Sequence, residues 1–284
     1  MKQFEYFSPN NVIETFALLT EFGSDAQILA GGTDVLIELR KPSVKAPKAI
    51  IDISCLSELK GITETESEIV IKPLSTHTEL GTSPVIKKYA RLLHMAANGI
   101  GSPQIRNRGT IGGNIMNAAT CADTIPPLMA LGATAKLQSI EGERNVPLID
   151  FFVKPYQTIA AKNELLTEVR FPKLLNLMKS AFIKLGRRNA LAISRLSVAA
   201  ILQKNDNGLI KEARIVPGAA FPKWQRMIEA EKILIGQKPT KELFAEAGQK
   251  VSEVMISFTG KRWSTEYKEP VIAVLVRRAL ERCV

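Results

Sequence analysis

Leu29-Ala-Gly-Gly-Thr-Asp34 and, much later in the chain, Gly109-Thr-Ile-Gly-Gly-Asn114 are two glycine-rich stretches with almost no side-chain cover. Glycine adopts positive φ without strain and lets a ligand come close to the main chain. Successive backbone N–H groups in such a stretch converge and form a concave site for an anion. We therefore expect both stretches to bind phosphate, and we call them the first glycine loop (residues 27–34) and the second glycine loop (residues 109–114).

The neighbours of the first glycine loop predict a strand, a tight turn and the start of a helix. The apolar run Gln27-Ile-Leu-Ala30 precedes the glycines, and Thr33-Asp34 stands before the amphipathic segment 35–40. Aspartate is a favoured residue at the start of a helix, and a phosphate bound there would lie at the positive helix end. Taken alone, the pattern favours an ordinary strand-to-helix turn, and the second glycine loop changes this balance.

The second glycine loop lies within a longer segment, residues 102–123, that is rich in small and amide side chains. Because this segment has few large apolar residues, we expect a loop rather than part of a hydrophobic core. Neither loop matches the G-x-G-x-x-G pattern of a dinucleotide-binding βαβ unit or the G-x-x-x-x-G-K-[ST] pattern of a P-loop. The ligand is therefore expected to be held in another way.

The composition is that of an ordinary soluble protein, with 45% hydrophobic and 23% charged residues. No stretch approaches the roughly 20 apolar residues of a membrane-spanning helix. The amino terminus lacks the apolar region of a signal peptide, which predicts a cytoplasmic protein. The net charge is +10, but only 6% of the residues are aromatic and no run of five basic residues occurs. Nucleic-acid binding is therefore not expected, and a solvated basic face or attraction to acidic partner subunits and dinucleotide phosphates fits better.

Residues that commonly carry catalysis or bind metals are few. The cysteines, Cys55, Cys121 and Cys283, form no C-x-x-C pair, and three are too few for a [2Fe–2S] cluster, which takes about four thiolates. Cys121 is expected to be an inert, buried thiol. His77 and His94 belong to no recognisable triad or metal motif, so both are expected to be structural. We assign no catalytic residue and no metal ligand, and redox chemistry would need a cofactor.

The periodicity along the chain predicts an α+β fold. Helices are expected over residues 11–22, 83–97, 224–235, 241–254 and 267–282, and hairpins over residues 61–74, 134–142 and 197–216. A helix is also expected after Asp123, which would cap it. At 284 residues the chain exceeds the usual single-domain size of roughly 100–200 residues, and a boundary is expected near residues 172–180.

Three further motifs accompany the glycine loops: Phe151-Phe-Val-Lys-Pro-Tyr-Gln-Thr158, Glu164-Leu-Leu-Thr-Glu-Val-Arg-Phe-Pro172 and Ala181-Phe-Ile-Lys-Leu-Gly-Arg-Arg188. Together the motifs resemble, nearly end to end, the FAD-binding subunit of the molybdenum hydroxylases, the family of xanthine dehydrogenase and carbon monoxide dehydrogenase. The resemblance implies a two-subdomain FAD-binding domain of the PCMH type over residues 1–175, divided into 1–55 and 56–175. A C-terminal α+β domain over residues 176–284 would contain an antiparallel sheet with helices.

The resemblance also implies which residues hold the FAD. The amides of residues 30–33 would bind the pyrophosphate, and the second glycine loop would complete the phosphate and ribityl site. Asp123 would accept a hydrogen bond from a ribose or ribityl hydroxyl, or would only cap its helix. Leu165 would lie against the cofactor and Lys184 near it, unless they are a core leucine and a solvated lysine. The full expected set is Gln27, Ile28, Leu29, Ala30, Gly31, Gly32, Thr33, Asp34, Gly109, Thr110, Ile111, Gly112, Gly113, Asn114, Asp123, Leu165 and Lys184.

Electron transfer is the activity that the resemblance implies. The partners would be an iron–sulfur subunit with two [2Fe–2S] clusters and a large molybdopterin subunit in a heterotrimer, and FAD would deliver electrons to NAD or another acceptor. Residues 187–193 match the segment that covers the flavin ring in relatives, although the family's frequent Asp-Ile pair is here Ala192-Ile193. Two alternatives remain, a freestanding FAD-dependent reductase and a non-catalytic nucleotide-binding or assembly module.

Overall fold

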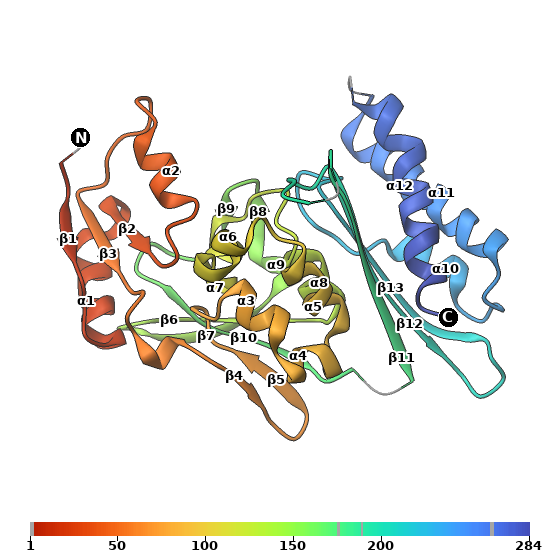
Figure 1. Ribbon diagram of the computed structural model, residues 1–284, viewed down its shortest axis with the longest axis horizontal. Helices are drawn as coiled ribbons and strands as arrows, with labels where there is room; N and C mark the ends of the chain where they lie inside the picture. The colour runs from red at the N-terminus through yellow and green to blue at the C-terminus, as the bar shows by residue number, and fades with distance from the viewer. Residues whose placement is uncertain (1–2, 175–176, 189, 262–263) are drawn as a thin grey trace.

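The computed structural model describes residues 3–174, 177–188, 190–261 and 264–284, and it begins with a small parallel sheet (Figure 1). The strand order is β1-β3-β2, and both pairings are parallel. Asn11 starts the first helix, because its side chain accepts a 2.8 Å hydrogen bond from the amide of Glu14. The elements of this unit are β1 (Glu5–Phe7), α1 (Val12–Phe22), a 3-10 helix (Gly23–Asp25), β2 (Ala26–Leu29), α2 (Val35–Arg40), β3 (Ala49–Asp52) and a second 3-10 helix (Ser57–Leu59).

A five-stranded sheet forms the centre of the molecule, with strand order β4-β5-β10-β6-β7 and antiparallel pairing throughout. Its strands are β4 (Ile62–Glu64), β5 (Glu68–Ile71), β6 (Thr134–Ser139), β7 (Gly142–Pro147) and β10 (Leu165–Pro172). Burial alternates along the second half of β10, where Val169 and Phe171 are fully buried and Glu168 and Arg170 only half-buried. The hairpins expected over residues 61–74 and 134–142 are both confirmed.

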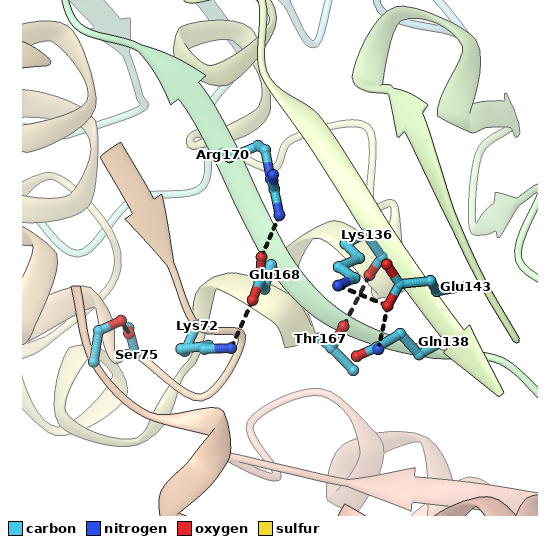
Figure 2. Close-up of polar contacts among 9 residues, drawn as sticks. Lys72, Ser75, Lys136, Gln138, Glu143, Thr167, Glu168 and Arg170 are labelled. Atoms are coloured by element: carbon cyan, nitrogen blue, oxygen red, sulfur yellow. Dashed lines mark hydrogen bonds and ion pairs between the residues drawn. The ribbon is translucent and has the colours of Figure 1, made fainter. Parts of the chain in front are cut away.

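The partly polar positions of this sheet carry ion pairs, which Figure 2 shows. Glu168 accepts hydrogen bonds from Lys72 Nζ at 2.8 Å and from Arg170 Nη2 at 2.6 Å. Beside them, Lys136 on β6 pairs with Glu143 on β7 at 2.7 Å. The Glu168–Lys72 pair links β10 to the end of β5 and the Lys136–Glu143 pair links β6 to β7, whereas Arg170 and Glu168 pair within β10.

Short helices lie over one face of the central sheet and bury its apolar side chains (Figure 1). They are α3 (His77–Thr82), α4 (Pro84–Tyr89), α5 (Arg91–Asn98), α6 (Pro103–Arg108), α7 (Ile111–Asn117), α8 (Ile125–Ala130) and α9 (Leu148–Phe151), and the last leads into the small hairpin β8 (Phe152–Lys154) and β9 (Gln157–Thr158). Helix α3 was not predicted. The helix expected over residues 83–97 is divided at Ala90, where φ is −145° and ψ is 52°.

The expectation that residues 102–123 form a loop outside the core is wrong. Most of the segment is helical, as α6 and α7, and Ile111 and Ile115 are fully buried in the main core. The reason is the small size of Gly112: a Cβ there would lie 2.5 Å from the Cβ of Pro73. Because the helix approaches its neighbour so closely, two isoleucines are enough to fill the space beneath it.

The C-terminal part is an antiparallel sheet of β11 (Met178–Leu185), β12 (Leu196–Lys204) and β13 (Ile210–Gly218), covered by α10 (Ile228–Leu234), α11 (Lys241–Thr259) and α12 (Thr265–Glu281). The hairpin expected over residues 197–216 is confirmed. Of the three expected helices, the first begins at residue 228 instead of 224 and the second extends to residue 259. Residues 175 and 176, between which the domain boundary was expected, lie outside the described residues.

Strand β12 is buried on both faces, which joins the two halves of the molecule. Ala199 and Ile201 belong to the core beneath α8, whereas Val198 and Ala200 belong to the core under α11 and α12. Within the described residues, no helix combines the length and the apolar stretch needed to cross a bilayer.

Candidate cofactor-binding site

Both glycine loops border one cavity of about 480 Å³. This volume falls within the range of roughly 300–1,000 Å³ that is usual for small-molecule sites. The loops are in direct contact, because a Cβ on Gly31 would lie 1.9 Å from the carbonyl oxygen of Arg108 and 3.2 Å from the Cα of Gly109. Gly31 is therefore required for the two segments to approach each other. The predicted residues that line the cavity are Gln27, Ile28, Ala30, Gly31, Gly32, Thr33, Asp34, Gly109, Thr110, Gly112, Gly113, Asn114 and Leu165.

The first glycine loop presents its main chain to this cavity. Residues 30–35 all line it, and within the described chain none of their backbone N–H groups donates a hydrogen bond to another protein group. Gly32 has φ +76°, the left-handed conformation that glycine adopts without strain. Asp34 precedes α2 but its side chain makes no capping hydrogen bond, so the expected carboxylate cap is wrong. The donors that an anion would need are all left free.

The second glycine loop uses its amides differently from the prediction. Ile111 N donates to Ser75 O at 2.9 Å, Gly112 N to Pro73 O at 2.8 Å, and Gly113 N to the hydroxyl of Thr110 at 3.1 Å. These amides fix α7 against the segment before α3 and are not bare. The glycines of this loop therefore serve close packing, and the loop borders the cavity without offering a row of donors.

Asp123 and Lys184 form a buried ion pair outside the cavity lining. Lys184 Nζ lies 2.7 Å from Asp123 Oδ2 and also donates to Gly99 O at 2.9 Å, and the Ser194 hydroxyl donates to Asp123 Oδ1 at 2.5 Å. Burial raises the pKa of Asp123, while Lys184 and Ser194 act in the opposite direction. The expected capping role is wrong, because α8 starts from Thr124 without a side-chain cap. Lys184 is not a solvated lysine either.

Leu29 and Ile111 are the other two predicted residues that do not line the cavity.

One wall of the cavity was missed from the sequence. Tyr156, Gln157 and Thr158 come from the β8–β9 hairpin, and residues 160–162 follow it. Tyr156 has φ +61°, which a non-glycine residue adopts only when the surrounding structure imposes it, and its amide donates to Ala118 O at 2.9 Å. The hairpin lies in the motif over residues 151–158, but nothing in that motif indicates a ligand contact.

Arg144 and Glu164 brace this wall. Arg144 donates to both carboxylate oxygens of Glu164, at 2.6 and 2.8 Å, and to Ile159 O at 3.1 Å. Glu164 Oε2 accepts a 2.6 Å hydrogen bond from Ala161 N. The hydrogen bond from Arg144 is the main cause of the lowered pKa of Glu164. Next to Glu164, Leu165 is buried both in the cavity wall and in the small core of the first unit.

His77 is a further lining residue, and its environment is unusual for a histidine. The side chain is 3% exposed, and Nδ1 is buried without a hydrogen-bond partner in the described part of the chain. Burial and, to a smaller extent, Arg106 lower the pKa of His77 to about 4. The imidazole is therefore uncharged at neutral pH.

Cys121 is half-buried. Burial and, to a smaller extent, the charge of Asp123 raise the pKa of its thiol.

The segment expected to cover the flavin ring lies beyond the cavity lining. The Arg188 guanidinium donates to Leu191 O, and Leu191 has φ +54°. Ile193 is 77% exposed, and residue 189 lies outside the described residues. None of the described residues of this segment lines the cavity.

Comparison with known proteins shows what this chain is similar to. Residues 2–174 match the family described as FAD binding domain in molybdopterin dehydrogenase, and residues 180–283 match the CO dehydrogenase flavoprotein C-terminal domain. The chain is 34% identical over 274 residues to the nicotinate dehydrogenase FAD-subunit of Eubacterium barkeri, covering 95% of this chain and 92% of that protein. It is 33% identical over 278 residues to the carbon monoxide dehydrogenase medium chain of Hydrogenophaga pseudoflava, covering 98% and 96%.

The fold agrees with these matches. A solved structure of carbon monoxide dehydrogenase from Hydrogenophaga pseudoflava, which lacks the Mo-pyranopterin moiety of its cofactor, superimposes with a TM-score of 0.92 at 32% identity and covers 100% of this chain and 99% of that chain. The predicted α+β fold, FAD as cofactor and the resemblance to molybdenum hydroxylases are confirmed. The chain therefore belongs to the family of FAD-binding subunits of the molybdenum-containing oxidoreductases.

Proposed function

We propose that this chain receives electrons from the iron–sulfur clusters of a partner subunit and delivers them to NAD or another acceptor. One observation carries the proposal: the unbonded amides of residues 30–35 face a single cavity that the second glycine loop also borders. When bound there, FAD supplies the ability to take up electrons singly and release them in pairs. The contribution of the protein is to bind and orient the cofactor.

We assign the diphosphate to the first glycine loop, because of the two loops it is the one in which several free N–H donors lie together. Asn114 and Leu165 line the same cavity and would contact other parts of the cofactor. We assign Asp123 and Lys184 to support of the site, since they satisfy each other outside the cavity lining. The braced wall of residues 156–158 and 160–162 borders the cavity on one side.

The partners that we propose are an iron–sulfur subunit with two [2Fe–2S] clusters and a large molybdopterin subunit. Three cysteines cannot supply the roughly four thiolates of even one such cluster, so the clusters would belong to another chain. The names of the relatives, FAD-subunit and medium chain, describe parts of larger enzymes. The net charge of +10 favours docking to acidic partner surfaces.

The experiment is to purify the chain with and without the subunits encoded beside it, and to titrate the flavin anaerobically with NADH. We expect one FAD per chain, copurification of an iron–sulfur chain, and bleaching of the flavin by NADH. Purified protein that neither retains nor rebinds FAD would contradict the cofactor site. Flavin that is bleached by NADH in a chain that never associates with an iron–sulfur subunit would support a freestanding reductase instead. Flavin that NADH leaves oxidised would exclude NAD as the acceptor.

A further inference from the structure

His77 is the first residue of α3 and combines two properties that no structural role explains. Its imidazole borders the cavity, yet the residue is only 3% exposed. Its Nδ1 atom has no hydrogen-bond partner among the described residues. A buried polar atom without a partner costs free energy, so folded proteins seldom leave one without a reason. The surroundings of the other ring nitrogen, Nε2, suggest what that reason is.

His77 packs against Gly109 of the second glycine loop, and Gly109 in turn touches the first glycine loop. The Cδ2–Nε2 edge of the ring faces Gly109, because a Cβ on Gly109 would lie 3.0 Å from Cδ2 and 3.4 Å from Nε2. Gly109 also contacts Gly31, whose ideal Cβ position is 3.2 Å from the Cα of Gly109. The histidine edge and the first glycine loop therefore meet at the same glycine, and both border the same cavity.

The proton of this imidazole belongs on Nε2. A neutral imidazole has one N–H donor and one acceptor, and His77 is neutral because burial, with Arg106 nearby, holds its pKa at about 4. A buried N–H without an acceptor is rarer in proteins than a buried acceptor without a donor. With Nδ1 sealed and unpartnered, the favourable tautomer carries the proton on Nε2, at the edge next to Gly109.

We propose that His77 is a cofactor-positioning residue, whose Nε2–H donates a hydrogen bond to a diphosphate oxygen of the dinucleotide held by the first glycine loop. The proposal rests on the function proposed above, and it adds a side-chain donor to a site otherwise made of backbone amides. A neutral donor suits this place, because it binds the anion without the cost of burying a second charge.

The test compares His77→Phe, which removes both ring nitrogens, with His77→Gln, whose side-chain amide restores a donor. His94→Phe is the matched control, because His94 also has a buried, unpartnered Nδ1 but does not line the cavity. Affinities are measured for three probes: FAD, ADP, which carries a diphosphate without flavin, and riboflavin, which carries flavin without phosphate. In His77→Phe we expect FAD and ADP to bind roughly tenfold more weakly, with riboflavin unchanged. In His77→Gln and His94→Phe we expect near-normal affinities.

Failure of this proposal is distinguishable from failure of the proposed function. If the wild-type chain binds none of the three probes, the cofactor site itself is misplaced. If the wild type binds FAD and His77→Phe binds FAD and ADP equally well, only the histidine proposal is overturned. An equal loss for riboflavin would reveal a merely structural role and also overturn it. Should His77→Phe not fold, nitrogen NMR of the wild type decides: a proton on Nδ1, or an Nε2 signal unmoved by ADP, contradicts the proposal.

Discussion

Gly31 and Gly32 are adjacent, but the structure requires glycine at each for a different reason. At Gly31 a side chain would collide with the backbone of Arg108, so the requirement is space. At Gly32 the conformation, φ +76°, is the requirement, because the nearest atoms to an added Cβ belong to the flexible side chains of Leu36 and Leu29. The first substitution would separate the two loops, and the second would bend the row of free amides.

Gly32→Ala therefore has a matched control elsewhere in the chain. Gly208, in the turn between β12 and β13, has the same φ of +76° with nothing within 4 Å of an added Cβ. We expect both alanine variants to lower the free energy of unfolding by about 1–2 kcal/mol through the left-handed conformation. Only Gly32→Ala should weaken FAD binding, measured by flavin fluorescence titration. Equal FAD affinity in the two variants would contradict the assignment of the diphosphate to the first glycine loop.

Asp123 and Lys184 are predicted to matter for folding more than for cofactor contact. Asp123→Asn leaves the ammonium group of Lys184 largely buried without its counter-ion. We therefore expect the free energy of unfolding to fall by about 3 kcal/mol. The double variant Asp123→Asn with Lys184→Met should recover much of that loss, because no unpaired charge remains. Urea denaturation of the FAD-free protein measures both. If the double variant loses as much free energy of unfolding as Asp123→Asn and Lys184→Met lose together as single variants, the two side chains act independently.

At the scale of elements, the sequence predicted those whose pattern is periodic and missed those set by contacts. The hairpins β4–β5, β6–β7 and β12–β13 follow from alternating apolar residues between turn signals. Helix α6 has a local start signal, a Ser102 cap followed by Pro103, which the overall composition of the segment over residues 102–123 outweighed in the prediction. Helix α7 was missed because it is held by Gly112 against Pro73 and by hydrogen bonds to Ser75 and Pro73, which are distant in sequence. For the same reason the sequence located the glycines of the cavity, but it did not reveal that only the first loop has free amides.

The cavity wall formed by the β8–β9 hairpin and residues 159–162 depends on a brace from another element. Arg144 on β7 holds Glu164 and Ile159 O, and Glu164 in turn holds Ala161 N. We expect Arg144→Met to loosen this wall and weaken FAD binding by roughly threefold to tenfold, because it removes two charge-assisted hydrogen bonds to Glu164 and one to Ile159 O. Lys136→Met, which breaks an ion pair between β6 and Glu143, the neighbour of Arg144 on β7, is the control. Equal FAD affinity in both variants would show that the wall does not depend on the brace.

The ion pairs of the central sheet predict a pH dependence of stability. Burial acts to raise the pKa of Glu168, but hydrogen bonds from Lys72 and Arg170 outweigh it and lower the pKa (Figure 2). A lowered carboxyl pKa stabilises the fold above the unfolded value of about 4.3, and this contribution is lost as the pH falls through the folded value. We expect Glu168→Gln to cost about 1–2 kcal/mol at pH 7 and progressively less below pH 4.3. Denaturant unfolding across this range checks it, and a constant difference would contradict it.

At the scale of the whole molecule, the two family matches cover regions that share a core. Alternate residues of β12 enter different cores: Ala199 and Ile201 pack with the central helices, and Val198 and Ala200 pack under the C-terminal helices. Trp224, which precedes α10, lies against Phe152 of the β8–β9 hairpin with ring centroids 4.7 Å apart. The C-terminal part therefore completes the hydrophobic core next to the cofactor cavity.

This shared core predicts that the chain unfolds as one unit although it matches two families. Separating the regions would expose both faces of β12, so an intermediate with one half folded should be scarcely populated. We expect calorimetry and far-UV circular dichroism to give a single transition with the same midpoint. FAD at about 100 times its dissociation constant should move the whole transition, adding about 2.7 kcal/mol of stability. Two separate transitions, with only the earlier or the later one shifted by FAD, would show that the C-terminal sheet does not stabilise the cofactor-binding half.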